Sequence, residues 1–117
     1  METNTVDVSD AYQYWSGTKP SAEIHVEKAQ YWQSAHFTKE YILYLKLKPD
    51  AEWWKKFIQQ NALEIKDAMW TDAEDTPDWF KPSTHSIQHG TKGFFDQGSR
   101  YFRDTLTGEC YIYEIQL

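Results

Sequence analysis

The stretch from residue 40 to 48 restricts the fold of this chain more than any other feature. Tyr41, Leu43, Leu45 and Leu47 alternate along it with charged or mixed side chains. A repeat of two is typical of a β-strand with one face in the protein interior. Pro49 ends the predicted strand, because proline has no amide hydrogen to donate to a neighbouring strand.

A helix is predicted directly after this strand. Asp50 stands where an N-cap residue is expected. The apolar face of the helix carries Trp53, Trp54, Phe57 and Ile58. Asn61 is a suitable residue for its end. We expect this aromatic face and the leucine face of the preceding strand to form one core.

Further strands are predicted on both sides of this unit. Residues 22–29 alternate in the same way, and residues 99–104 and 109–117 are rich in Tyr, Phe and Ile. Asp104 and Gly108 suit the turn between the last two segments. The predicted fold class is α+β: an antiparallel sheet of about four or more strands, with one amphipathic helix packed on one face and a C-terminal β-hairpin. An irregular β-sandwich or half-barrel is the alternative.

The chain of 117 residues has room for one domain, which we expect to span residues 21–117. Residues 1–20 are rich in small polar side chains and predict a loosely ordered N-terminal arm. Tyr12, Tyr14 and Trp15 fit a free arm poorly, because aromatic rings are costly to leave in water. The alternative is that these rings dock on the domain or on a partner.

The charge balance disfavours several classes of function. Asp and Glu number 18 against 12 Lys and Arg, for a net charge of -6. Nucleic-acid binding is not expected, because Lys and Arg supply most of that affinity. No apolar run reaches the ~18 residues of a membrane-spanning helix, and the first 14 residues do not resemble a signal peptide. With its single cysteine, the protein is expected to be cytoplasmic and to need no cofactor.

No catalytic or metal-binding motif is recognised. His85 and His89 have the spacing of a zinc pair on a helix, but no HExxH pattern accompanies them, so two surface histidines are favoured. His36 is interpreted as a histidine that bonds backbone groups at a corner, in preference to a general base. Cys110 is interpreted as a small core residue in preference to a reactive thiol.

Aromatic side chains supply the candidate binding residues. The predicted pocket combines Trp32, Trp79, Tyr101 and Tyr113 with polar groups from His36 and Arg100. In such a pocket Arg100 would hold a carboxylate. The favoured alternative is a structural ion pair across the hairpin, in which Arg100 or Arg103 pairs with Glu114 or Glu109.

A second candidate surface is acidic. It consists of Asp67, Asp72, Glu74, Asp75 and Asp78. Such a segment is either a solvated loop or a surface that steers a basic protein partner. The many Tyr and Trp residues support the second interpretation, because these side chains are favoured anchors at protein interfaces.

Two segments resemble signatures of small uncharacterised bacterial proteins. Residues 31–38 have the pattern YWxSxHFT, and residues 99–114 have the pattern SRYFxDxxTGxxYIYE. This resemblance would cover residues 24–117 and implies no activity and no site. In size, acidity and lack of catalytic motifs the chain is also similar to immunity proteins, which neutralise bacterial toxins.

The sequence therefore predicts a non-enzymatic binding protein, such as an inhibitor or immunity-type protein. It would engage a basic partner through an acidic, aromatic-rich surface. The alternative is a small-molecule-binding domain or small enzyme, with an aromatic pocket that contains His36 and Arg100. Mimicry of nucleic-acid charge is a third interpretation, which the 12 interspersed basic residues disfavour.

Overall fold

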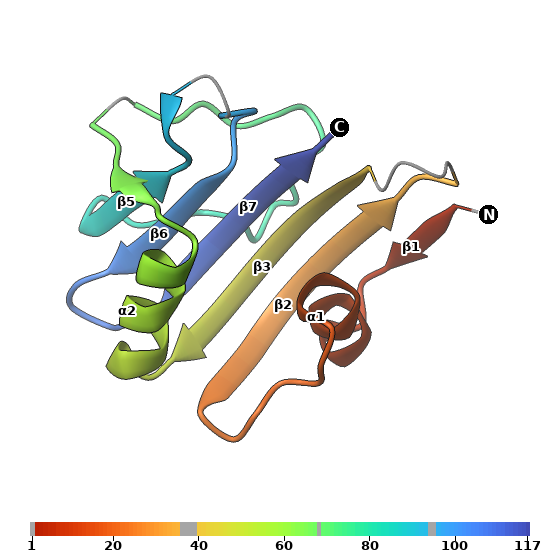
Figure 1. The fold of residues 1–117 in the computed structure, drawn as a ribbon, viewed down its shortest axis with the longest axis horizontal. Coiled ribbons are helices and arrows are strands. Elements are labelled where there is room, and N and C mark those ends of the chain that lie inside the picture. Colours follow the sequence, from red (N-terminus) through yellow and green to blue (C-terminus); the bar gives the residue numbers. More distant parts are fainter. Residues whose placement is uncertain (1, 36–39, 68, 94–95) are drawn as a thin grey trace.

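The centre of the molecule is an antiparallel β-sheet (Figure 1). The computed structural model describes residues 2–35, 40–67, 69–93 and 96–117. In chain order their elements are β1 (Thr3–Thr5), α1 (Val8–Ser16), β2 (Ile24–Gln33), β3 (Tyr41–Pro49), α2 (Ala51–Gln60), β4 (Glu64–Ile65), β5 (Ser86–Gly90), β6 (Arg100–Asp104) and β7 (Cys110–Gln116). Within this described part the sheet has seven strands, in the spatial order β1-β2-β3-β7-β6-β5-β4. The fold is α+β, with more strands than the minimum of four predicted.

The strand β3 lies between β2 and β7, where the three leucines of its predicted core face are fully buried and Tyr41 is partly buried. Leu43, Leu45 and Leu47 have no exposed surface. A register shift on β2 between Val26 and Lys28 is a β-bulge. Because the bulge adds one residue to its strand, Val26 and Ala29 both reach the core although they are three positions apart.

Two helices cover the same face of the sheet, which we call the helix face (Figure 1). The helix α2 begins after Asp50, whose carboxylate accepts the amide of Trp53 at 2.8 Å, as predicted for an N-cap. Its Trp54 is buried, and its other aromatic residues pack against the leucine face of β3. The prediction of one helix was incomplete, because α1 packs beside α2.

The N-terminal segment holds a strand and a helix at residues 3–16, where composition predicts a loosely ordered arm. Ala11 and Tyr12 of α1 are buried in the core of the helix face. Asp7 caps this helix by accepting the amide of Asp10 at 2.8 Å, and Gly17 ends it with a φ of 87°. Burial of Tyr12 explains the order of the segment, since its polar residues alone favour none.

The opposite face of the sheet, which we call the loop face, carries a second core. Residues on it alternate with those of the first core: Tyr44, Phe102, Tyr111 and Tyr113 come from the strands. The segment that joins β4 to β5 covers them with Trp70, Trp79 and Phe80. Phe80 is 1% exposed, so this side chain of the loop segment belongs to the interior of the second core.

Strands β6 and β7 are antiparallel neighbours, paired from Arg100 with Tyr113 to Arg103 with Cys110. In the turn between them the carboxylate of Asp104 accepts the amides of Leu106 and Thr107, at 2.7 and 3.0 Å. Neither helix in the described part of the chain is long and apolar enough to cross a membrane.

Candidate functional site

The predicted aromatic pocket is divided between the two faces of the sheet. Arg100 and Tyr101 are neighbours in β6, so their side chains project from opposite faces of the sheet. Tyr101 belongs to the core of the helix face, and Tyr113 belongs to the core of the loop face. Trp79 packs edge-on against Phe80 in the loop-face core.

Two members of the predicted pocket remain. Trp32 is half-buried in β2, opposite Ile42 of β3. Trp32 follows Tyr31, which lies in the helix-face core, so the side chain of Trp32 projects from the loop face. His36 lies outside the described residues.

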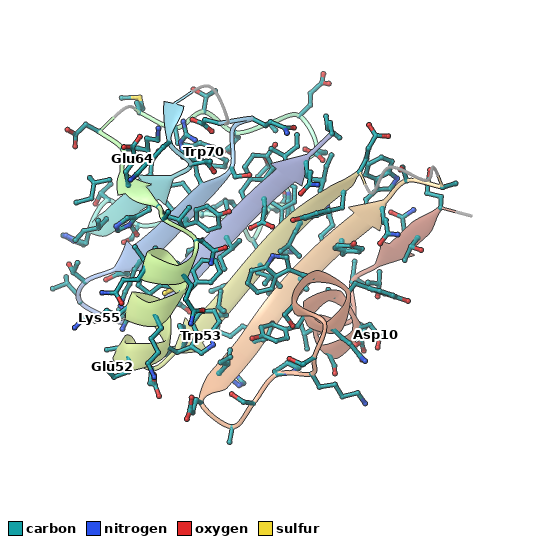
Figure 2. All side chains as sticks on the ribbon, viewed as in Figure 1. Asp10, Glu52, Trp53, Lys55, Glu64 and Trp70 are labelled. Atoms are coloured by element: carbon teal, nitrogen blue, oxygen red, sulfur yellow. The ribbon has the colours of Figure 1, made fainter. Side chains whose placement is uncertain are left out.

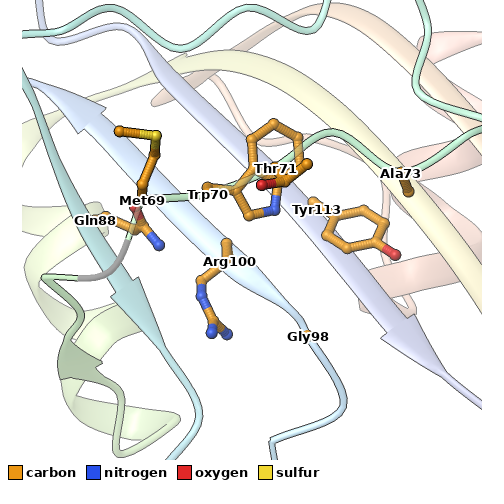
Figure 3. A pocket seen from close by; sticks show the side chains of 8 residues that line it. All are labelled: Met69, Trp70, Thr71, Ala73, Gln88, Gly98, Arg100 and Tyr113. Atoms are coloured by element: carbon orange, nitrogen blue, oxygen red, sulfur yellow. The ribbon is translucent and has the colours of Figure 1, made fainter.

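Arg100 and Tyr113 do share a cavity, of about 320 Å³ (Figure 3). Figure 3 shows Trp70, Gln88 and Tyr113 around the Arg100 side chain. The guanidinium group donates to Asp96 Oδ1 at 2.9 Å and to the carbonyl of Ser99 at 2.7 Å. Its charge is therefore already paired inside the chain.

The partner of Arg100 is not one of the glutamates predicted from the hairpin. Tyr113 is paired with Arg100, and both side chains project from the loop face. Glu114 follows Tyr113 in the strand, so its side chain projects from the helix face. Burial alone would raise the pKa of Asp96, but the hydrogen bonds from Arg100 and from the amide of Gly98 lower it overall. The predicted ion pair across the hairpin was therefore wrong: Arg100 pairs with Asp96, four residues earlier, and Arg103 contacts Cys110 Sγ at 3.6 Å.

A larger groove of about 840 Å³ lies beside this cavity, between residues 65–67 and 69–72 on one side and residues 80–88 on the other. We call it the loop-side groove. Trp70, Phe80 and Phe102 contribute aromatic rings to it. Three exposed apolar side chains also line it: Ile65 at 64%, Met69 at 94% and Ile87 at 45% exposure. An apolar surface of this kind is typical of an interaction site.

The predicted acidic residues lie on the segment that forms this groove. All of them are exposed: Asp67, Asp72, Glu74, Asp75 and Asp78. Asp67 and Asp72 line the groove itself. Asp75 has a structural role, because it accepts a hydrogen bond of 2.7 Å from the hydroxyl of Tyr44 and so ties the segment to β3.

A separate site on the helix face centres on Glu114 of β7. Glu114 Oε1 accepts hydrogen bonds from Trp15 Nε1, at 3.0 Å, and from the hydroxyl of Tyr41. Glu114 Oε2 accepts one from the hydroxyl of Tyr101, at 2.6 Å. Burial, and then the negative charge of Glu114, raise the pKa of Tyr41 and of Tyr101 far above the usual range. Both phenols therefore stay protonated and act as donors.

Two cavities meet at this carboxylate. The first, of about 360 Å³, is lined by Glu114 together with Tyr12, Trp15, Tyr41, Trp53 and Phe57, among others. Figure 2 shows Trp53 on the side of α2 that faces α1, with Lys55 on the side away from it. The second cavity, of about 450 Å³, shares Tyr41, Asn61 and Glu114 and continues along β7. We call the first cavity the helix-side pocket.

The histidines and the cysteine do not form a site among the described residues. His85 is exposed, and burial lowers the pKa of His89. No group of three or more metal-ligating side chains occurs in the described ranges. Cys110 is fully buried, and burial raises the pKa of its thiol to about 12 although Arg103 lies close by. It is a core residue, as the sequence indicates, and has little nucleophilic character.

The described residues thus define an α+β domain with one antiparallel sheet, one groove on its loop face and one aromatic pocket on its helix face. No protein-family model matches the chain, and no curated protein or solved structure matches it. Function is therefore inferred from these two surfaces.

Proposed function

We propose that this protein is a non-enzymatic binding protein whose loop-side groove takes an apolar segment of a basic protein partner. One observation carries the proposal. Ile65, Met69 and Ile87 are exposed around an aromatic groove that Asp67 and Asp72 also line.

The apolar part of the groove would supply most of the affinity. Removing exposed aliphatic surface from water contributes about 25 cal/mol for each Å² buried. Met69, the most exposed of these side chains, is unbranched and adapts its shape to a partner. Aromatic rings such as Trp70 are favoured anchors in the centre of an interface.

The charges around the groove favour a basic partner. Two lysines, Lys66 and Lys81, also line the groove. The ammonium group of Lys66 is paired with Glu64 at 3.2 Å and with Asp96 at 3.6 Å. Lys81 is exposed and forms no ion pair with a described residue, so it offsets part of the negative charge. Asp67 and Asp72 form no ion pair with a described residue. Unpaired acids at a rim accelerate the approach of a basic protein and select against acidic ones.

A comparison of three baits tests this proposal. The wild-type protein, the double variant Met69→Asp/Ile87→Asp and the control variant Leu106→Asp are immobilised and exposed to host lysate at low ionic strength. Leu106 is 74% exposed and lies in the turn between β6 and β7, so it controls for a new charge on an exposed apolar residue. Bound proteins are quantified by mass spectrometry, and each candidate is then purified and its affinity measured by calorimetry.

The expected result is a basic protein that binds the wild type and the Leu106→Asp variant. We expect the groove variant to bind it at least about tenfold more weakly. Added salt should slow its association, as electrostatic steering requires. The proposal is wrong if every purified candidate binds the groove variant as tightly as the wild type.

A further inference from the structure

The helix-side pocket combines one carboxylate with several aromatic rings. Five of the side chains that line it are aromatic: Tyr12, Trp15, Tyr41, Trp53 and Phe57. Trp53 and Phe57 are stacked, with ring centroids 5.2 Å apart and an interplanar angle of 6°. Trp15 meets Phe57 edge-on at 5.7 Å. The pocket is therefore bounded by ring faces and ring edges from both helices.

The carboxylate of Glu114 has no positive partner in the described part of the chain. None of the ion pairs there includes it. Its three donors are an indole and two phenols, which orient the carboxylate but do not neutralise it. Neither lysine nor arginine lines the helix-side pocket or the adjoining cavity.

One acceptor position of Glu114 also remains open. A carboxylate has about four lone-pair positions, two on each oxygen. Oε1 accepts from Trp15 and Tyr41, whereas Oε2 accepts from Tyr101 alone among the described residues. A ligand with a positive charge and an N–H or O–H donor can fill this position.

We propose that the helix-side pocket binds an organic ammonium ion, with Glu114 as its counter-ion and the surrounding rings as its cation–π partners. Aromatic faces attract a poorly hydrated cation within about 6 Å of the ring centroid, and Trp is the best of them. The pocket volume of about 360 Å³ is near the lower end for ligand sites, which fits an ammonium ion with few carbon atoms.

A metal ion fits this pocket less well. Hard cations need several oxygen ligands, and no group of three or more metal-ligating side chains exists in the described ranges. The rings around Glu114 would leave a small, strongly hydrated ion without ligands. The ammonium ion can belong to a free small molecule or to a lysine side chain of another protein. This site is on the opposite face from the loop-side groove, so it is independent of the proposed function.

Binding is tested by titration with choline, n-butylammonium and the neutral carbon isostere of choline, 3,3-dimethylbutan-1-ol. The indole N–H resonance of Trp15 reports on the pocket, because this group donates to Glu114. Glu114→Gln removes the charge and keeps an acceptor, and Trp53→Leu removes a ring. Glu52→Gln is the matched control, because Glu52 is an exposed residue of α2 that does not line the pocket.

We expect choline or n-butylammonium to shift the Trp15 resonance and bind at least about tenfold more tightly than the neutral isostere. Glu114→Gln should weaken this binding by about tenfold or more, and Glu52→Gln should leave it unchanged. If Glu114→Gln does not fold, Trp53→Leu must show the loss. Two peptides, one with lysine and one with trimethyllysine, distinguish the two sources. Tighter binding of either peptide than of its free counterpart, n-butylammonium or choline, would indicate a protein side chain.

Three results would overturn the proposal. The first is equal binding of choline and its neutral isostere, which would make the pocket merely apolar. The second is wild-type affinity in Glu114→Gln or, where that variant does not fold, in Trp53→Leu. The third is that neither ammonium ion shifts the Trp15 indole resonance, even at concentrations far above the millimolar range. None of these results bears on the loop-side groove.

Discussion

The two faces of this sheet are covered in different ways, and the remaining surface differs accordingly. The helix face is covered by α1 and α2 (Figure 1). A pocket of about 360 Å³, lined by residues of both helices, remains on this face. The loop face is covered by an irregular segment, residues 66–67 and 69–85, and a groove of about 840 Å³ remains. A helix satisfies its own backbone and can present a continuous apolar stripe to a sheet. An irregular segment packs through single side chains such as Phe80, and the surface between those side chains stays open.

The largest effect is expected from truncating the core on each face. Leu45→Ala removes a fully buried side chain from the helix face, and Phe80→Ala removes one from the loop face. We expect the free energy of unfolding to fall by about 2–5 kcal/mol for Leu45→Ala and about 3–5 kcal/mol for Phe80→Ala. Urea denaturation followed by circular dichroism measures both values.

This pair tests whether the loop face is a true core. A loss below about 1 kcal/mol for Phe80→Ala would mean that the covering segment lies on the sheet without stabilising it. Leu106→Ala is the control, because Leu106 is 74% exposed and its truncation should change stability by no more than about 0.5 kcal/mol.

The contrast between the faces also explains what the sequence could predict. The strand β3 and the helix α2 have regular periods and a local cap at Asp50, so neighbouring residues are enough to define them. The covering segment, residues 66–67 and 69–85, has no such period, so neither its path nor the loop-side groove could be predicted. The bulge on β2 places the core residues Val26 and Ala29 three positions apart, a spacing that strict two-residue alternation does not predict.

The site at Glu114 was beyond prediction for a related reason. Its donors Trp15, Tyr41 and Tyr101 are 99, 73 and 13 residues away in sequence. Only the order of strands in the sheet and the docking of α1 bring them together. From sequence, Glu114 was a candidate for a hairpin ion pair, because the register of the hairpin could not be known.

A smaller effect is expected from the hydrogen bond that ties the covering segment to the sheet. Tyr44→Phe removes the hydroxyl that donates to Asp75 Oδ1 at 2.7 Å. We expect the free energy of unfolding to fall by about 1 kcal/mol. Amide hydrogen exchange should accelerate in residues 69–85 and remain unchanged in α1 and α2. Tyr14→Phe, at a side chain of α1 that is half exposed, is the control.

The acid dependence of stability should come partly from the loop face. Hydrogen bonds from Ser83 and from the amides of Thr107 and Leu106 lower the pKa of Asp104, in that order of size. A carboxyl whose pKa is lower in the folded state stabilises the fold above its unfolded pKa, and this contribution is lost as the pH falls through the folded value. Asp104→Asn should therefore flatten the decline in stability below about pH 5.

Asp67→Asn is the matched control for this pH experiment, because Asp67 is an exposed carboxylate of the covering segment. It removes one negative charge without removing the hydrogen bonds of the turn. The free energy of unfolding of both variants is measured by urea denaturation across the pH range. An equal decline in the two variants below about pH 5 would contradict the role assigned to Asp104.

The smallest effect concerns Cys110, which can show whether the two faces open separately. Its thiol has no exposed surface, lies on the helix face, and has a pKa raised to about 12 by burial. A thiol reagent at mildly alkaline pH should label it only through unfolding, so labelling should be slow in the native protein and fast in concentrated guanidinium chloride. Tyr44→Phe loosens the loop face alone, and we expect it to speed labelling only in proportion to its loss of global stability. Labelling in that proportion would mean that the sheet and both its covers open as one cooperative unit. A larger acceleration would mean that a partial opening, which starts on the loop face, exposes Cys110 without global unfolding.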